Sequence, residues 1–325
     1  MFGNFVGNNK WGNGKVDMNK EFEFKKCQIA LFNPKIDAYY HNLVLIRDAA
    51  KLLDKEQTTR CHRYLDFVYN CANKYLMPLD DEMLEKALDE TNAFIAANRN
   101  SANQFRVHAV GHCHIDTAWM WPYEETKRKI ARSWSTQLEF IHNLFKDRGF
   151  KFCASSAAHY WWLKEYYPEL FKRVQAAVKE GLFEIVGGTW VEFDGNVPNG
   201  ESMARQFLYG QHFFEDEFGV KPSIFFLPDT FGYSPQLPQI SKNAEIKYFV
   251  TQKLSWSFWN KFPHHTFHWK GIDGSQVLAH FPPSDTYVSN GSVKEVLDNV
   301  KNLRDKGRTE CALLLFGDGD GGGGP

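Results

Sequence analysis

The chain has 325 residues, and its 38 Lys and Arg nearly balance 39 Asp and Glu, for a formal net charge of −1. This balance disfavours long-range attraction to nucleic acid or to an anionic membrane, and no apolar run is long enough to predict a membrane span. The six cysteines are scattered without a C-x-x-C pair and no apolar leader opens the chain, so we expect reduced thiols and a cytoplasmic rather than a vacuolar or lysosomal protein.

Residues 1–100 differ from the rest of the chain in composition and in hydrophobic pattern. A start rich in Gly and Asn is followed by three helical patterns, near residues 37–54, 57–76 and 81–97. We therefore expect an accessory or lead-in segment, partly helical, before a larger domain over residues 101–325.

From Phe105 onward, short apolar runs alternate with amphipathic stretches. Helices are expected at 124–146, 168–179, 201–217, 235–243 and 293–305. The apolar runs are FRVHAVG, KFCASS, LFEIVGG, SIFFLP, KYFVTQ, FHW, VLAHF and ALLLF. The alternation predicts parallel strands covered by helices, as in an α/β barrel or an open sheet.

Functional residues of parallel α/β folds collect at the carboxyl ends of the strands, because the loops there share one crevice. The polar and aromatic side chains that follow the apolar runs are therefore candidates for one site. They are His112, His114, Asp116, Trp190, Glu192, Asp229, Lys253, Asp318 and Asp320.

The segment GHCHIDTAWMWP, residues 111–122, offers the richest set of ligating groups. In extended chain, residues two apart point to the same side, so His114 and Asp116 can converge on one ion. An imidazole with carboxylates suits zinc or a similar divalent metal. The alternative is that both are ordinary hydrogen-bonded polar residues at a strand end.

Two later segments add carboxylates. In LPDTFGYS, Asp229 emerges where Pro228 breaks an apolar run, and it could equally serve as a turn or helix-cap residue. In FGDGDGGGGP the formal G-x-G-x-x-G is rejected as a dinucleotide motif, because its aspartates would repel a pyrophosphate. Glycines around Asp318 and Asp320 suit a backbone that lies close under a substrate, and a tail without structure is the alternative.

Together, seven motifs resemble the class II α-mannosidases of glycoside hydrolase family 38, most closely the cytosolic branch. They are GHCHIDTAWMWP, VGGTWVEFDGN, FLPDTFGYSPQLPQI, YFVTQKLSW, FPHHTF, GIDGSQVLAHFPP and FGDGDGGGGP. They recur in that order over residues 105–325, whereas residues 1–100 show no clear match. The resemblance implies a (β/α)7 barrel and a retaining enzyme that cleaves terminal α-mannosides of oligosaccharides.

The resemblance also implies roles for individual residues. His114 and Asp116 would bind the metal, Zn²⁺ or Co²⁺, and Asp229 would be both ligand and nucleophile. Trp119 would lie against the mannose ring, and Lys253, which stands where other branches carry a basic residue near the nucleophile, would be a second substrate-binding residue.

The acid that completes the reaction must come from a second carboxyl group. We expect Asp320, because a glycine-lined strand end could bring it over the leaving group. The cytosolic branch usually has an aromatic residue where this chain has Asp318, so Asp318 is kept as the alternative. The family's fourth metal ligand is a histidine further downstream, so we expect an N-terminal piece of a longer enzyme, with weak metal binding and little activity by itself. Self-association of the chain is left open.

Two other functions compete with this interpretation. A metal-dependent carbohydrate deacetylase can use an Asp/His site, and His108 and His112 have the H-x-x-x-H spacing that such enzymes use. A carbohydrate-binding protein that kept the barrel without catalysis is the non-enzymatic alternative.

Overall fold

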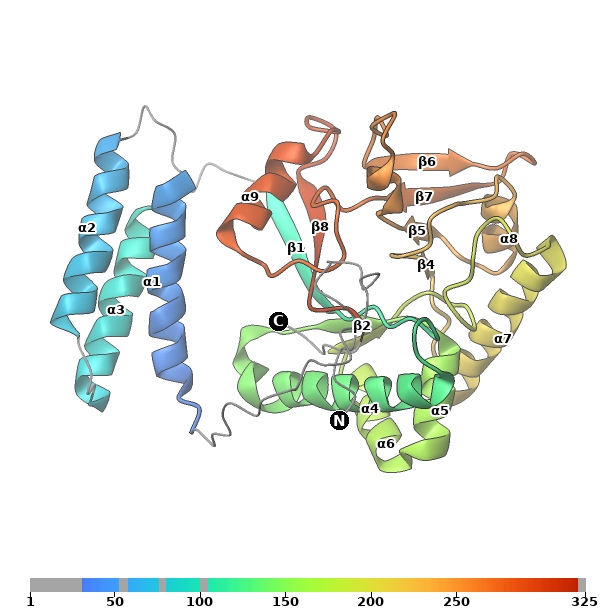
Figure 1. The fold of residues 1–325 in the computed structure, drawn as a ribbon, viewed down its shortest axis with the longest axis horizontal. Helices are drawn as coiled ribbons and strands as arrows, with labels where there is room; N and C mark the ends of the chain where they lie inside the picture. Colours follow the sequence, from blue (N-terminus) through green and yellow to red (C-terminus); the bar gives the residue numbers. More distant parts are fainter. Residues whose placement is uncertain (1–30, 53–57, 76–79, 100–104, 321–325) are drawn as a thin grey trace, which may run out of the picture.

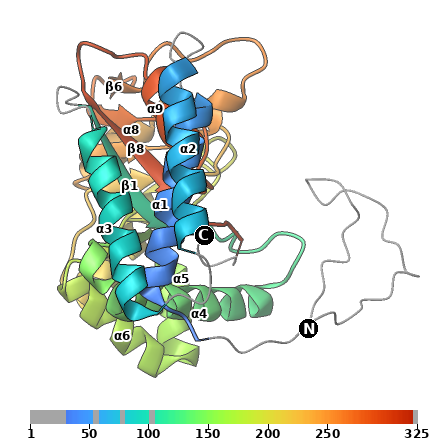
Figure 2. The same ribbon diagram turned by 90° about the vertical axis from the view of Figure 1, so that its left-hand side faces the viewer.

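The computed structural model of the protein describes residues 31–52, 58–75, 80–99 and 105–320. Three long helices form a bundle beside a larger α/β part (Figure 1). The bundle lies against the α/β part through α1 and α9, and Figure 2 views the molecule from the bundle's side.

The bundle confirms the three helices expected before residue 100, within the described residues. They are α1 (Pro34–Leu52), α2 (Thr58–Lys74) and α3 (Asp81–Ala97). Tyr39, Cys71 and Leu84 are buried between them. Asp80 starts α3 by accepting a hydrogen bond from the backbone N–H of Met83, at 2.7 Å, which satisfies one of the free donors of the first turn.

The strands form two four-stranded sheets. The first has the order β3-β2-β1-β8 and is parallel throughout, and the second has the order β4-β5-β7-β6. The strands of the first sheet are β1 (Arg106–His112), β2 (Phe152–Ala154), β3 (Phe183–Ile185) and β8 (Cys311–Phe316). Those of the second are β4 (Ile224–Phe226), β5 (Tyr248–Val250), β6 (Thr266–Lys270) and β7 (Gln276–His280).

One strand departs from the expected parallel arrangement. β6 runs antiparallel to β7, with Thr266 opposite His280. The connection over residues 271–275 is too short for the crossover that two parallel strands need, and Gly274, at φ 89°, makes a tight turn instead. FHW and VLAHF are thus the two arms of a hairpin.

The two sheets contact each other on two sides. The N–H of Gly187, just after β3, donates to the carbonyl of Ile224 in β4 at 2.8 Å. On the other side His280 of β7 accepts the N–H of Leu313 in β8, at 3.3 Å, through Nε2. The fold is therefore mixed α/β with parallel strands and covering helices, as the sequence predicted at this level.

The helices of the α/β part follow the expected order with two differences. They are α4 (Tyr123–Glu139), α5 (Ala157–Tyr166), α6 (Pro168–Lys179), α7 (Gly200–Phe218), α8 (Leu237–Asn243) and α9 (Val293–Asn302). The helix expected over 124–146 stops being α-helical at Phe140, where a π-helical turn (Phe140–Leu144) and a short 3-10 turn (Lys146–Arg148) follow. α5 was not predicted, because AAHYWWLKEY lacks a clear polar face.

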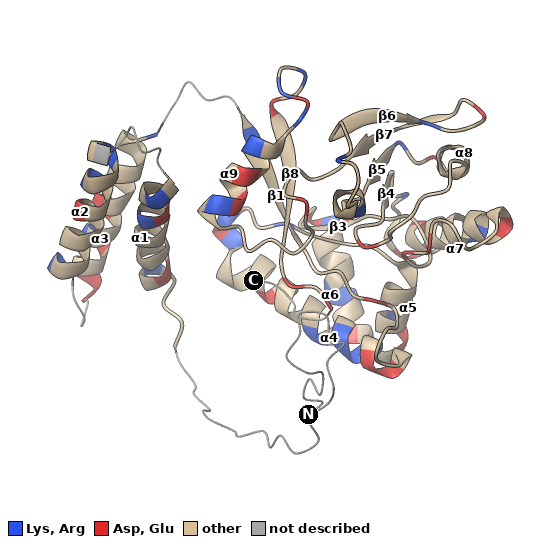
Figure 3. Ribbon diagram, turned by 45° about the horizontal axis from the view of Figure 1, so that its top comes forward, with Lys and Arg blue, Asp and Glu red and all other residues tan. Residues whose placement is uncertain are grey.

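Large aromatic side chains fill the space between helices and strands. Trp134 and Tyr160 pack against Phe183 of the first sheet, and Phe207 packs against Phe225 of the second. Positively and negatively charged residues are mixed along the outer helices (Figure 3). Among the described helices, none is both long and apolar enough to cross a membrane.

Candidate metal centre

Three of the predicted residues come together at the carboxyl ends of the strands. His114 and Asp116 follow β1 in the first sheet, and Asp229 follows β4 in the second. Their ligand atoms all lie within 4.8 Å of one another. Within the described ranges, no other group of three or more His, Cys, Asp or Glu side chains is as close.

The geometry of this cluster suits a divalent cation. His114 Nε2 lies 3.2 Å from Asp116 Oδ1 and 3.4 Å from Asp229 Oδ2, so one nitrogen and two carboxylate oxygens face the same point. The imidazole is buried, whereas the two carboxylates are partly open to solvent. A nitrogen ligand with two anionic oxygens fits zinc or another first-row divalent metal, so these three side chains are chemically suited to bind such an ion.

Glu192 orients the imidazole from the opposite side. Its Oε2 lies 3.2 Å from His114 Nδ1, and Ser155 Oγ donates to Oε1 at 2.6 Å. A carboxylate on the second nitrogen fixes the orientation of a metal-binding histidine. The sequence placed Glu192 among the residues at strand ends but gave no sign of this partnership.

The charges of the cluster shift its pKa values. Burial lowers the pKa of His114, but the neighbouring Glu192, Asp116 and Asp229 outweigh burial and raise it well above its usual value. Burial raises the pKa of Asp229, but His114 and Lys253 more than offset this and lower it to about 2. Asp229 is therefore ionised throughout the physiological range.

Lys253 lies beside Asp229, as the sequence predicted. Its buried ammonium contacts Asp229 Oδ1, the oxygen that faces away from His114. The same ammonium lies 3.3 Å from the centre of the Trp256 ring, one turn further along the 3-10 segment Lys253–Trp256. Trp256 was not predicted, although KLSW places it three residues after Lys253 as one turn of such a helix requires.

Asp320 joins the centre from the end of β8. Its Oδ1 accepts the backbone N–H of Asp116 at 3.1 Å, and its backbone N–H donates to the carbonyl of His114. Burial, and after it the charge of Asp116, raises the pKa of Asp320 above its usual value. Asp318 is exposed, and its side chain makes no hydrogen bond to another described residue.

Two aromatic residues lie near the ligands, Trp119 in the sequence and Tyr287 in space. Trp119 is 55% exposed, and its ring forms a T-shaped pair with that of Trp121. Tyr287, which the sequence did not single out, has its ring 5.3 Å from that of His114. The structure thus leaves the Trp119 ring open, and its contact with a sugar stays a prediction.

His108 and His112 do not form a second metal site. His112 is buried, with Nδ1 3.2 Å from the carbonyl of Cys153, and burial, then the charge of His114, lowers its pKa to about 3. His108 is exposed on β1. His112 is a neutral core residue, and this pair gives the deacetylase alternative no ligands.

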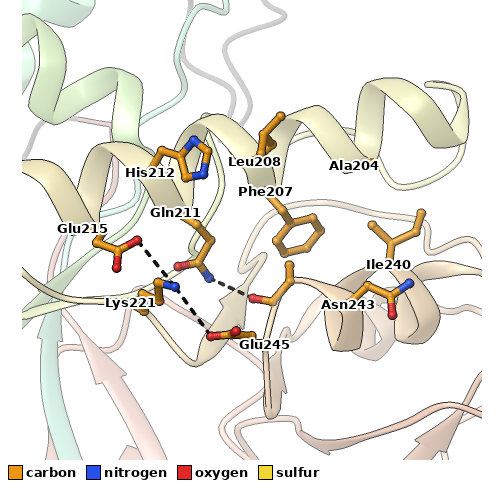
Figure 4. Close-up of a pocket in the computed structure, with 11 residues that line it drawn as sticks. Ala204, Phe207, Leu208, Gln211, His212, Glu215, Lys221, Ile240, Asn243 and Glu245 are labelled. Carbon is orange, nitrogen blue, oxygen red and sulfur yellow. Dashed lines mark hydrogen bonds and ion pairs between the residues drawn. The ribbon is translucent and has the colours of Figure 1, made fainter.

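A hollow of about 350 Å³ between α7 and α8 is separate from this centre (Figure 4). Lys221 and Glu245, which line it, precede β4 and β5, whereas Asp229 and Lys253 follow those strands. The hollow therefore lies toward the opposite ends of the strands from the metal cluster.

Comparison with known proteins supports one family. Residues 104–325 match the model of the glycosyl hydrolases family 38 N-terminal domain. Alpha-mannosidase G of Dictyostelium discoideum is 47% identical over 309 residues, which are 95% of this chain and 28% of that protein. Alpha-mannosidase 2C1 of Homo sapiens is 47% identical over 312 residues, with 95% and 29% covered. The chain thus spans less than a third of these curated relatives.

The similarity is not confined to the α/β part. Because these alignments cover 95% of the chain, they extend through most of residues 1–100, where the sequence alone showed no clear match. Among solved structures, an alpha-mannosidase from Enterococcus faecalis V583 has a similar fold, with a TM-score of 0.56 at 21% identity over 68% of this chain and 26% of that one.

Proposed function

The chain belongs to glycosyl hydrolase family 38, and from this premise we propose that it carries the catalytic groups of a retaining α-mannosidase. The observation that supports this most strongly is the convergence of His114, Asp116 and Asp229 from two sheets onto one point. The substrates would be terminal α-mannosides of oligosaccharides, which are neutral and agree with a chain of near-zero net charge.

His114, Asp116 and Asp229 would hold one divalent cation, Zn²⁺ or Co²⁺. When bound, such an ion supplies positive charge that can bind sugar hydroxyls and keep a carboxylate ionised. The strands that deliver these ligands would close as a (β/α)7 barrel, with the β6 hairpin arm outside the ring of seven. The contacts of β3 with β4 and of β7 with β8 support this closure.

In the first step, a carboxylate oxygen of Asp229 attacks the anomeric carbon while the bond from that carbon to the leaving oxygen breaks. Asp320 gives its proton to the leaving oxygen, and its raised pKa suits a carboxyl group that must hold a proton. In the second step Asp320 takes a proton from water, the water oxygen bonds to the anomeric carbon, and Asp229 is released. Two inversions give overall retention.

Lys253 would hold the Asp229 carboxylate in place before it attacks the anomeric carbon. Its buried ammonium contacts the oxygen of Asp229 that faces away from His114, so the carboxylate has little freedom to turn. Asp320 is preferred to Asp318 as the acid because Asp320 contacts Asp116, whereas Asp318 is exposed.

The proposal is tested by covalent trapping. The full-length protein, loaded with zinc or cobalt, should react with a ring-fluorinated α-mannosyl fluoride, because the ring fluorine slows both steps while the good leaving group keeps the first step faster than the second, so the glycosyl-enzyme accumulates. Mass spectrometry of the peptides should place the label on Asp229. A label on another carboxylate, with Asp229 unmodified, would contradict the assignment, and mannose binding without turnover under any added metal would favour the non-catalytic alternative.

A further inference from the structure

A second group of polar side chains surrounds a hollow of about 430 Å³, where the segments that follow β5, β7 and α9 meet. It is lined by Lys261, His265, Asp285, Asn302 and Arg304. None of these residues belongs to the metal cluster, and none has a role in the reaction described above.

His265 is a fixed hydrogen-bond donor in this hollow. The side chain is 4% exposed, and its Nδ1 accepts the backbone N–H of Arg304 at 3.0 Å, so the hydrogen of the neutral ring is on Nε2. Burial, then the charge of Arg304, lowers the pKa of His265 to about 4, which keeps the ring neutral near pH 7. In the described part of the chain, Nε2 has no hydrogen-bond partner.

The charged groups around the hollow are exposed at the surface, unlike His265. The side chains of Lys261, Asp285 and Arg304 make no ion pair or hydrogen bond with another residue that the structure describes. The other nearby carboxylate, Asp305, is already occupied by His264 and by the backbone N–H of His265. Two cations and one carboxylate thus face the same space with free hydrogen-bonding atoms.

This combination of two cations, one carboxylate and a neutral imidazole favours one class of ligand. An anion would meet the carboxylate of Asp285, and a simple cation would meet Lys261 and Arg304. A neutral molecule with several hydroxyl groups can donate to Asp285 and accept from Arg304, Lys261 and His265, and hydrogen bonds to charged groups are the stronger kind. A sugar has these properties.

Chain segments that line this hollow and the one beside it continue into the metal centre. The neighbouring hollow, which is smaller, is lined by Gln252, the residue before Lys253, and Gln252 Nε2 donates at 3.3 Å to the carbonyl of Pro228, the residue before Asp229. Asp285 precedes by two residues Tyr287, whose ring is 5.3 Å from that of His114.

We propose that this hollow is a second sugar-binding subsite, which holds a distal mannose unit of an oligosaccharide whose terminal mannose occupies the catalytic centre. The proposal rests on the proposed function, and it adds a location for the part of the substrate that is not cleaved. Asp285 and Arg304 bind neighbouring hydroxyl groups of the distal sugar, and His265 donates a hydrogen bond to a third.

The test compares a long and a short substrate in the full-length metal-loaded protein. Arg304→Gln and Asp285→Asn each remove one charge, and Asn tolerates the left-handed backbone of Asp285, at φ 54°. For each variant, KM for α-linked mannotriose should rise about tenfold more than KM for an aryl α-mannoside, because only the trisaccharide reaches the subsite. Arg308→Gln, at an exposed position on the same loop and outside the hollow, is the matched control and should change neither KM by more than about twofold.

The outcomes separate this proposal from the proposed function. Equal changes of KM for both substrates, or no change for either, would overturn the subsite while leaving the mannosidase intact. If the protein cleaves neither substrate, calorimetric titration of mannotriose still tests the subsite, and binding should weaken about tenfold in Arg304→Gln. Undiminished binding in that variant, or tighter binding of a zwitterionic amino acid such as glycine, would refute it.

Discussion

At the scale of single residues, Asp229 is held from two sides by charged neighbours. One of its oxygens faces His114 at 3.4 Å and the other contacts Lys253. Burial would favour its protonated form, yet the two neighbours hold its pKa at about 2. An ionised, fixed carboxylate is what a nucleophile at an anomeric carbon requires.

Trp256 contributes to this constraint through Lys253. Because the ammonium lies 3.3 Å from the centre of the Trp256 ring, Trp256→Leu removes an attraction of about 1 to 2 kcal/mol and loosens the pairing of Lys253 with Asp229. We expect kcat/KM for an aryl α-mannoside to fall about tenfold in the full-length protein, and Trp256→Phe to recover most of the loss.

Trp259→Leu is the matched control, since Trp259 belongs to the same loop and is 92% exposed. It should leave kcat/KM within about twofold of the wild type. If Trp256→Leu behaved like this control, the ring would have no positioning role.

At the scale of elements, the order of the strands and of every described helix but α5 could be predicted, because short apolar runs alternate with amphipathic stretches along the chain. α7 and α9 also begin at good caps, Asn199 and Ser292, so their starts were nearly correct. The pairing of β6 could not be read from FHW, because a three-residue apolar run does not specify the direction of its neighbour. α5 was missed for lack of a polar face.

The candidate site was predicted to a similar extent. His114, Asp116 and Asp229 follow apolar runs. Because functional residues of parallel α/β folds lie at the carboxyl ends of the strands, this placement alone predicts that the three lie close together. Glu192 and Tyr287 act through contacts between distant segments, which periodicity does not encode. Family resemblance, rather than spacing, was needed to assign roles to Lys253 and Asp320.

His280 joins three strands and makes this junction sensitive to pH. Its Nδ1 lies 2.9 Å from Thr266 Oγ1 in β6, and its Nε2 accepts the N–H of Leu313 in β8. Burial, then the charge of His265, lowers the pKa of His280 from 6.5 to about 4. Between these two values the unfolded chain binds a proton that the folded chain does not, so stability is full above pH 6.5 and is lost as the pH falls toward 4.

We expect protonation of His280 to reduce the free energy of unfolding by about 1 to 3 kcal/mol as the pH falls from 6.5 to about 4. Urea unfolding of the wild type and of His280→Gln at about pH 7 and about pH 4.5 would measure it, because glutamine can accept the same N–H without titrating. The variant should lose less stability on acidification than the wild type. Equal losses would show that His280 does not control this pH dependence.

At the scale of the whole molecule, the centre depends on both sheets. β1 and β8 of the first sheet supply His114, Asp116 and Asp320, and β4 and β5 of the second supply Asp229 and Lys253. Asp116 and Asp320 are bonded although 204 residues separate them in sequence. A functional centre therefore requires the two sheets to be held together, which the contacts at Gly187 and His280 do.

The central claim is that His114, Asp116 and Asp229 hold one divalent cation. The most direct measurement is anomalous X-ray diffraction from crystals of the full-length protein soaked in zinc, with data collected on both sides of the zinc absorption edge. The account predicts one strong peak about 2.0 to 2.2 Å from His114 Nε2, an Asp116 oxygen and an Asp229 oxygen. Full zinc occupancy at another set of side chains, with no peak between these three, would contradict it.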